Sequence, residues 1–130
     1  MEPTRGPSPA QFCLQAAEAE GVRELMTTIG DKWSVFLVVC LRKSPGHRAR
    51  FSQLGREVPG ISQKVLTATL KKLERDGFVR RELFAEVPPR VEYELTPLGL
   101  RFFRLAQGIV SWASENWTEI ETARARYESE

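Results

Sequence analysis

The sequence predicts a mainly α-helical domain with one small β-hairpin, and three observations lead to this fold class. Apolar residues recur at helical spacing over two neighbouring segments, residues 51–58 and 62–76, which a Pro-Gly turn joins. Apolar and charged residues alternate over residues 90–95, as in a strand with one buried face. A long segment of helical periodicity follows from residue 97. Helix, turn, helix and hairpin in this order are typical of a winged helix-turn-helix fold.

The N-terminal part of the chain is expected to form helices ahead of this motif. Ser8 and Pro9 suit the N-cap and the first position of a helix, and they open an amphipathic arm. We expect Gly21 to interrupt or loosen this arm and a second helical stretch to run over residues 22–29. Residues 33–41 then form a helix that is apolar nearly all round, which places it centrally in the domain.

The segment over residues 62–76 is the second helix of the motif, with Ser62 as its N-cap and Gly77 at its end. Its leucines form one stripe, which we expect to pack inward. The opposite face is basic, and its small side chains near the N-terminal end allow it to enter a groove of DNA. This face carries Lys64, Ala68, Lys71 and Arg75, with Gln63 and Thr67 on one flank. An ordinary amphipathic helix with solvent-facing lysines is the alternative.

A hairpin and a long helix follow. Residues 78–84 and 90–95 are expected to pair as strands around a turn at residues 86–89. Thr96 and Pro97 then open the last helix, which bears two adjacent apolar stripes. Two stripes need two covering surfaces, so we expect a homodimer through the N- and C-terminal helices rather than a monomer that buries both. The expected interface residues are Phe12, Leu14, Phe102, Leu105, Ile109 and Trp112.

Length and charge indicate one small domain with a basic middle. The 130 residues, 42% of them hydrophobic, suffice for one compact core. Residues 42–104 hold 14 Lys and Arg against 7 Asp and Glu, whereas the rest holds 5 against 10. A basic middle suits a surface that faces phosphates, although a solvated basic surface would look the same. We expect a flexible N-terminus over residues 1–10, the domain with its dimerisation helices over residues 11–120, and a charged tail over residues 121–130.

The candidate DNA-binding residues divide into base readers and phosphate contacts. Gln63 and Thr67 can address base edges, and Lys64 can reach a guanine edge or a phosphate. Lysines further along the helix suit phosphates, and arginines of the hairpin suit the DNA backbone or a minor groove. The full set expected at double-stranded DNA is Arg50, Ser62, Gln63, Lys64, Thr67, Ala68, Lys71, Lys72, Arg80, Arg81 and Arg90.

The sequence argues against an enzyme, a cofactor or metal site and a membrane partner. His47 is the lone histidine, and no phosphate-binding glycine loop or metal-ligand cluster appears. Two cysteines are too few for a disulfide framework, and Cys40 lies in an apolar run where inert packing is expected. The longest apolar run, residues 35–41, is far shorter than a membrane span. We therefore expect a cytoplasmic, nucleoid-associated protein without a cofactor.

Five stretches resemble the HxlR-type transcriptional regulators, a bacterial branch of winged-helix proteins related to the MarR type. They are IGDKWS at residues 29–34, RFSQL at 50–54, PGISQKVLT at 59–67, LERDGFV at 73–79 and VPPRVEYELTPLG at 87–99. The resemblance implies a homodimer whose two recognition helices read a palindromic site about one helical turn apart. It also implies an N-terminal cysteine that senses oxidants or electrophiles. Cys13 is the candidate, and it lies further from Gly30 than is usual in the family.

The interpretation that follows is a sequence-specific DNA-binding regulator of transcription. We expect it to act as a homodimeric repressor on a palindromic operator, with a small-molecule or oxidant effector and Cys13 as the redox-sensing candidate. Two alternatives stay open: a winged-helix module that binds protein instead of DNA, and a ligand-responsive regulator without a cysteine switch.

Overall fold

The computed structural model describes residues 16–130, and the chain divides into two compact units, Met1–Asp31 and Lys32–Glu130. In the first unit, α1 (Ala16–Ile29) is one uninterrupted helix. The expected interruption at Gly21 is therefore wrong, because a single glycine costs a helix only about 1 kcal/mol and its neighbours are mostly good helix formers. The helix ends before Gly30 as expected, and the Gly30 N–H donates to the Met26 carbonyl at 2.9 Å.

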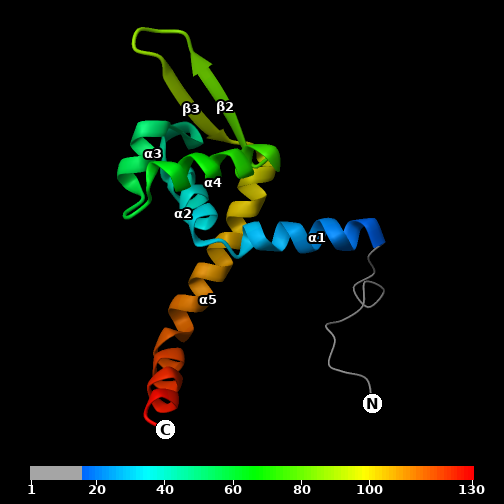
Figure 1. Ribbon diagram of the computed structural model, residues 1–130, viewed down its shortest axis with the longest axis vertical. Helices are drawn as coiled ribbons and strands as arrows, with labels where there is room; N and C mark the ends of the chain where they lie inside the picture. Colours follow the sequence, from blue (N-terminus) through cyan, green and yellow to red (C-terminus); the bar gives the residue numbers. More distant parts are fainter. Residues whose placement is uncertain (1–15) are drawn as a thin grey trace. The chain divides into compact units, whose positions relative to one another are not determined.

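The second unit contains the remaining elements of Figure 1. In chain order they are α2 (Lys32–Lys43), the short 3-10 helix η2 (Pro45–His47), β1 (Arg48–Arg50), α3 (Phe51–Glu57), α4 (Gln63–Arg75), β2 (Val79–Phe84), β3 (Arg90–Leu95) and α5 (Pro97–Glu128). The hairpin of β2 and β3 projects from the helical body as a wing. The predicted fold class, mainly α with a helix-turn-helix and a β-hairpin, is confirmed.

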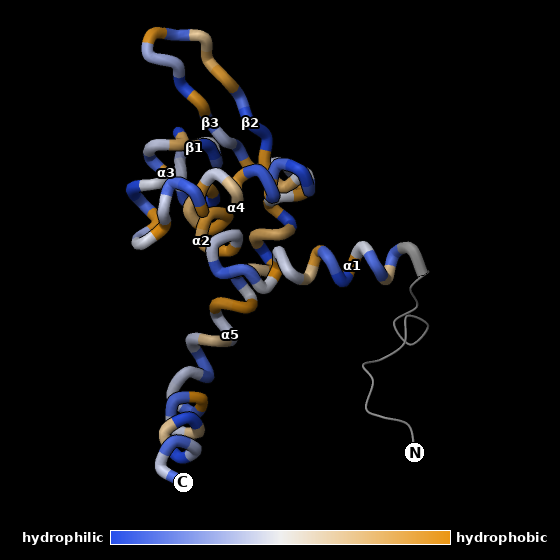
Figure 2. The backbone as a smooth tube through the Cα atoms, viewed as in Figure 1, coloured by the Kyte–Doolittle hydropathy of each residue, from blue (hydrophilic) through white to orange (hydrophobic). Residues whose placement is uncertain are grey.

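The core of this unit forms around α2. Leu37, Val38 and Leu41 have no exposed surface, and the three leucines of α4 are buried as predicted. Figure 2 shows the hydrophobic stretches gathered around α2. The helix is central, but one apolar face stays open, because the Phe36 side chain is 47% exposed and Cys40 is half-buried.

The three strands form one antiparallel sheet in the order β1-β3-β2. Tyr93 in the central strand lies opposite Ala49 on one side and Arg81 on the other. Because side chains alternate along a strand, one face packs on the core, with Ala49, Val79, Tyr93 and Leu95 buried, and the outer face is charged. Strand β1 was not predicted, since three residues with two arginines show no strand periodicity.

The first turn of α5 is fastened to the base of the wing. The Thr96 hydroxyl accepts a hydrogen bond from the Gly99 N–H at 3.0 Å and donates one to the Gly77 carbonyl at 2.6 Å. A Cβ atom at Gly99 would overlap the carbonyl of Phe78, so only glycine fits there. Phe78, expected in the strand, precedes β2 and stacks on Phe102 with ring centroids 4.6 Å apart. Gly77, with φ of +82°, provides the predicted stop after α4.

Helix α5 runs for 32 residues and is covered only near its start. Its buried residues are Gly99, Phe102 and Ala106, and every later side chain is half-buried or exposed. Residues 121–128, expected as part of a charged tail, continue the helix. Among the helices described, none is long and apolar enough to span a bilayer.

Candidate nucleic-acid interface

Helix α4 holds most of the residues expected at DNA, and its cap fixes where it begins. The Ser62 hydroxyl accepts a hydrogen bond from the Val65 N–H at 3.1 Å, and Gly60 in the preceding turn has φ of +80°. The buried leucines hold one side of the helix, so the opposite side faces outward. The exposed residues there are Ser62, Gln63, Lys64, Ala68 and Lys71, whereas Thr67 and Lys72 are half-buried.

The outward side of α4 combines hydrogen-bonding groups with positive charge. The Gln63 amide both donates and accepts, the Thr67 hydroxyl does the same, and Lys64 and Lys71 add ammonium groups. Toward the C-terminal end, Arg75 pairs with the adjacent Asp76 at 3.3 Å. A protruding helix with these groups can both attract a polyanion and address base edges.

An arginine pairs with carboxylates on the outer face of the sheet. Arg48 of β1 donates hydrogen bonds to Glu92 and Glu82, and it lies 3.5 Å from Glu94. The bonds to Glu92 and then Glu82 raise the pKa of Arg48, and the bond from Arg48 holds the pKa of Glu92 below its ordinary value. Sequence reasoning missed this cluster. The alternation of charged residues in β3 predicted a polar face, but the counterion lies on the strand that was not expected.

Two of the expected DNA contacts are engaged within this sheet. Arg80 pairs with Glu94, and Arg90 pairs with Glu92 at 2.8 Å. The Arg90 guanidinium also lies over the Phe84 ring, with its Cζ atom 4.0 Å from the ring centroid. Carboxylates therefore compensate the charge of both arginines.

Arg50 and Arg81 are placed differently. Both are exposed, and both line a groove of about 570 Å³ between the start of α3 and the wing. The carboxylate that lines the same groove belongs to Glu86, which pairs with Arg90 at 3.2 Å. Two arginines from separate elements thus line one concave site, and a guanidinium group is suited to bind a phosphate.

The expected dimer residues on α5 fall into two groups. Leu105, Ile109 and Trp112 are 50%, 43% and 61% exposed, so residues 16–130 leave much of their apolar surface uncovered. Phe102 differs from the expectation: it is 5% exposed and belongs to the core, because the stacked Phe78 ring covers it. The exposed row also includes Val110 and Trp117, which are both 45% exposed.

Three expected residues cannot be placed. Phe12, Cys13 and Leu14 lie outside the described residues 16–130. Within that range, no group of three or more His, Cys, Asp and Glu side chains is arranged to hold a metal ion.

Comparison with known proteins identifies the family. The model of the HxlR-like helix-turn-helix family matches residues 28–121. The HTH-type transcriptional regulator YtfH of Escherichia coli K12 is 37% identical over 102 residues, which cover 78% of this chain and 79% of that protein.

Solved structures agree with this assignment. A transcriptional regulator ytfH from Salmonella typhimurium matches with a TM-score of 0.73 and 36% identity, over 80% of this chain and 90% of that one. The redox regulator HypR in its reduced form matches with a TM-score of 0.68 and 33% identity, over 78% and 98% of the two chains. The chain belongs to the HxlR-like helix-turn-helix family and is a transcriptional regulator of the helix-turn-helix type.

Proposed function

We propose that this protein binds operator DNA as a homodimer, with α4 in the major groove, and represses transcription from that site. The observation that carries the proposal is the two-sided character of α4. Its leucines are buried in the core, while Gln63, Lys64 and Lys71 are exposed on the other side. A helix held in this way meets the steric and chemical needs of major-groove recognition.

Specific roles follow from position along α4. Gln63, Lys64 and Thr67 lie in its first turn and a half, where the recognition helix of such a motif contacts base edges. Ala68 leaves room for the groove wall, and the exposed Ser62 cap and Lys71 suit phosphate oxygens, as does Lys72.

The wing supplies backbone contacts. We assign a phosphate to the groove that Arg50 and Arg81 line, because each of these exposed residues brings a guanidinium group to its wall. Arg80 and Arg90 contribute less to phosphate binding than Arg50 and Arg81, since each is paired with a glutamate.

The homodimer rests on the uncovered row of α5. Leu105, Ile109 and Trp112 expose apolar surface along one helix, and a second copy of the same helix covers such a row in a two-fold dimer. Two recognition helices related in this way read a palindromic site about one DNA turn apart. A dimer seated on a promoter excludes polymerase, which is the basis of the proposed repression.

Redox sensing through Cys13 is a second proposal, supported by the similarity to the redox regulator HypR. Its test is the operator affinity of wild type and Cys13→Ser with and without a quinone. Loss of binding in wild type alone supports the switch, and equal loss in both proteins excludes Cys13 from it.

The main test measures binding to a duplex selected from a random pool and to an unrelated duplex, by fluorescence anisotropy, from about 50 to 200 mM salt. Gln63→Ala or Lys64→Ala should weaken the selected duplex by about 1–3 kcal/mol and leave the unrelated one nearly unchanged, whereas Lys72→Ala should weaken both. Arg126→Ala, at an exposed site near the end of α5, is the control. Affinity that does not fall with salt, or no binding to any duplex, would favour a protein-binding module.

A further inference from the structure

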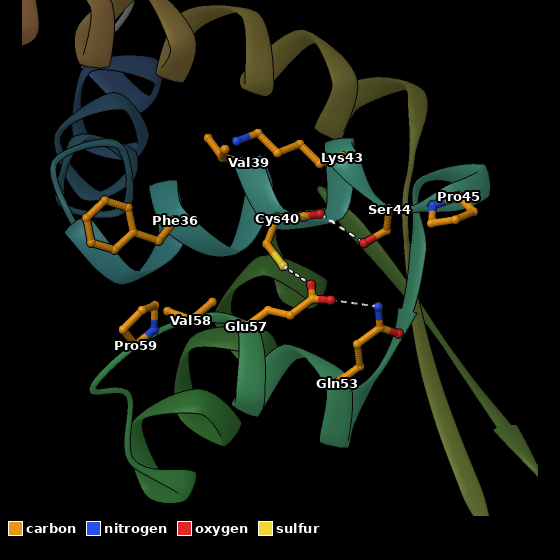
Figure 3. Close-up of a pocket in the computed structure, with 10 residues that line it drawn as sticks. All are labelled: Phe36, Val39, Cys40, Lys43, Ser44, Pro45, Gln53, Glu57, Val58 and Pro59. Atoms are coloured by element: carbon orange, nitrogen blue, oxygen red, sulfur yellow. Dashed lines mark hydrogen bonds between the residues drawn. The ribbon is translucent and has the colours of Figure 1, made fainter.

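A pocket of about 600 Å³ opens on the side of α2 that the core leaves uncovered. Its walls come from α2, the segment after it, α3 and the start of the turn that leads to α4. In Figure 3, Phe36 and Pro59 lie toward one end, Gln53 and Ser44 toward the other, and Glu57 between them. The volume is within the range of pockets that bind small molecules, about 300–1,000 Å³.

The pocket has mainly apolar walls and one hydrogen-bonded acid, Glu57, which is exposed to solvent and lies near Arg56. The Cys40 thiol donates to Glu57 Oε2 at 2.9 Å, and the Gln53 amide donates to Glu57 Oε1 at 2.9 Å. These two bonds, in that order, lower the pKa of Glu57, so its carboxylate is an anion at neutral pH. Each carboxylate oxygen keeps a further lone pair for a ligand.

The thiol in the pocket is a donor and not a nucleophile. Burial, followed by the hydrogen bond to Glu57, raises the pKa of Cys40 to about 12. The protonated thiol therefore holds the carboxylate in place, and covalent capture of an electrophile at this sulfur is disfavoured.

The apolar walls select the body of the ligand, and the acid selects its charge. Phe36 offers an exposed ring at the end of the pocket, supported edge-on by Trp33 with ring centroids 6.2 Å apart. An aromatic face and a carboxylate together favour an organic cation, which gains from both. Lys43 also lines the pocket, but its side chain extends away from Glu57 in Figure 3.

The pocket touches the part of the motif that positions α4. Glu57 is the last residue of α3, and Val58 and Pro59, which also line the pocket, begin the turn to α4. Val58 is 3% exposed, so this part of the turn is packed and not free to adjust independently. A ligand in contact with the turn therefore interacts differently with different placements of α4, which is the requirement for coupling to DNA.

We propose that this pocket binds a small organic cation with an aromatic body, held by Glu57 and Phe36, and that the ligand changes DNA affinity through the turn between α3 and α4. The binding of the cation to the pocket can be tested without DNA. The effect of the ligand on DNA affinity rests on the proposed function.

The first test uses fluorescence anisotropy without DNA. Rhodamine 6G, a cation, and fluorescein, an anion with the same ring system, are titrated with the full chain. We expect rhodamine 6G to bind at least tenfold more tightly than fluorescein. Glu57→Gln should weaken rhodamine binding about tenfold or more, and Phe36→Leu should weaken it about threefold to tenfold. Glu115→Gln removes an exposed carboxylate on α5 and should leave binding unchanged. Thermal unfolding of each variant establishes that it is folded.

Equal binding of the two dyes, or rhodamine binding that survives Glu57→Gln in a folded protein, would overturn the ligand site.

The second test measures duplex affinity with saturating rhodamine 6G for wild type and for Glu57→Gln, which corrects for dye that binds DNA directly. If the dye shifts the duplex affinity of wild type alone by threefold or more, the coupling is supported. If the dye binds through Glu57 but wild type has the same duplex affinity with and without it, the coupling is overturned. No duplex binding even without dye contradicts the proposed function and leaves the dye result valid.

Discussion

Arg48 of β1 donates a hydrogen bond to Glu82 of β2 across the intervening strand β3. One side chain thus joins the two outer strands of the sheet and compensates carboxylates that would repel DNA phosphates. We predict that Arg48→Met lowers the free energy of unfolding by about 1 kcal/mol, because Glu82 loses its partner while Glu92 and Glu94 keep Arg90 and Arg80. Urea unfolding followed by tryptophan fluorescence measures this loss. Arg126→Met, at an exposed site, is the matched control, and equal stability of the two variants would contradict the role of Arg48.

The pairing of Arg48 with Glu92 makes the stability of the fold depend on pH. The pKa of Glu92 is lower in the folded protein than in the unfolded chain, where it is about 4.3. The carboxylate therefore stabilises the fold fully above the pKa of the unfolded chain, and this contribution is lost as the pH falls through the lower pKa of the folded protein. We expect unfolding midpoints in urea to fall less steeply between about pH 5 and pH 3 in Glu92→Gln than in wild type. Glu119→Gln, at an exposed position of α5, should keep the wild-type slope, and an identical slope in all three proteins would exclude Glu92.

Two glycines of α5 should respond in opposite directions to the same substitution. Gly99→Ala places a Cβ atom against Phe78, 3.0 Å from its carbonyl carbon, and should destabilise the fold by about 2–3 kcal/mol. Gly108→Ala meets no atom within 4 Å and should stabilise the helix by about 0.5–1 kcal/mol. Thermal unfolding by circular dichroism distinguishes them. A tolerated alanine at Gly99 would show that α5 and the wing are not in close contact.

Substitutions at Phe102 and Trp112 should distinguish an effect on the stability of the fold from an effect on dimerisation. Phe102→Ala removes a buried ring and should cost about 3–5 kcal/mol of stability. Trp112→Glu changes a ring that is 61% exposed, so the monomer should stay folded while the proposed dimer dissociates. Sedimentation velocity and urea unfolding on both variants measure the two effects. A Trp112→Glu protein with the same sedimentation coefficient as wild type would place the dimer interface elsewhere.

The Cys40 thiol should react slowly with alkylating agents. With its pKa raised to about 12 by burial and by Glu57, it should react with iodoacetamide at pH 8 more than about 100-fold slower than free cysteine. The measurement uses Cys13→Ser protein and mass spectrometry. Glu57→Gln removes the carboxylate that raises this pKa and should speed the reaction. Rapid labelling of Cys40 in folded Cys13→Ser protein would contradict the assignment of its thiol as a stable donor.

Local patterns predicted most of the fold because each element has its own sequence signal. The leucines lie within α4, the Ser62 cap and the Gly77 stop flank it, and the structure places each as expected. The predicted interruption at Gly21 was wrong because one unfavourable residue does not end a helix whose neighbours favour it.

Features that depend on contacts between distant segments were missed. Strand β1 exists because Arg48 and its neighbours pair with β3, more than forty residues away in the chain, and its three residues carry no period of their own. Separations of 34 and 44 residues likewise hid the pairing of Arg48 with Glu82 and Glu92. The periodicity of α5 marked Phe102 as apolar, but only the stacked Phe78 ring shows that it faces the core.

The fastening of Thr96 to Gly77 and Gly99 gives the wing and α5 a common rigid joint. A helix of 32 residues is about 48 Å long, so its far end amplifies any rotation about that joint. A tilt of a few degrees moves the last turn by several ångströms while the hairpin base shifts by much less. The same two hydrogen bonds therefore help to set both the angle at which α5 leaves the body and the angle at which the wing leaves it.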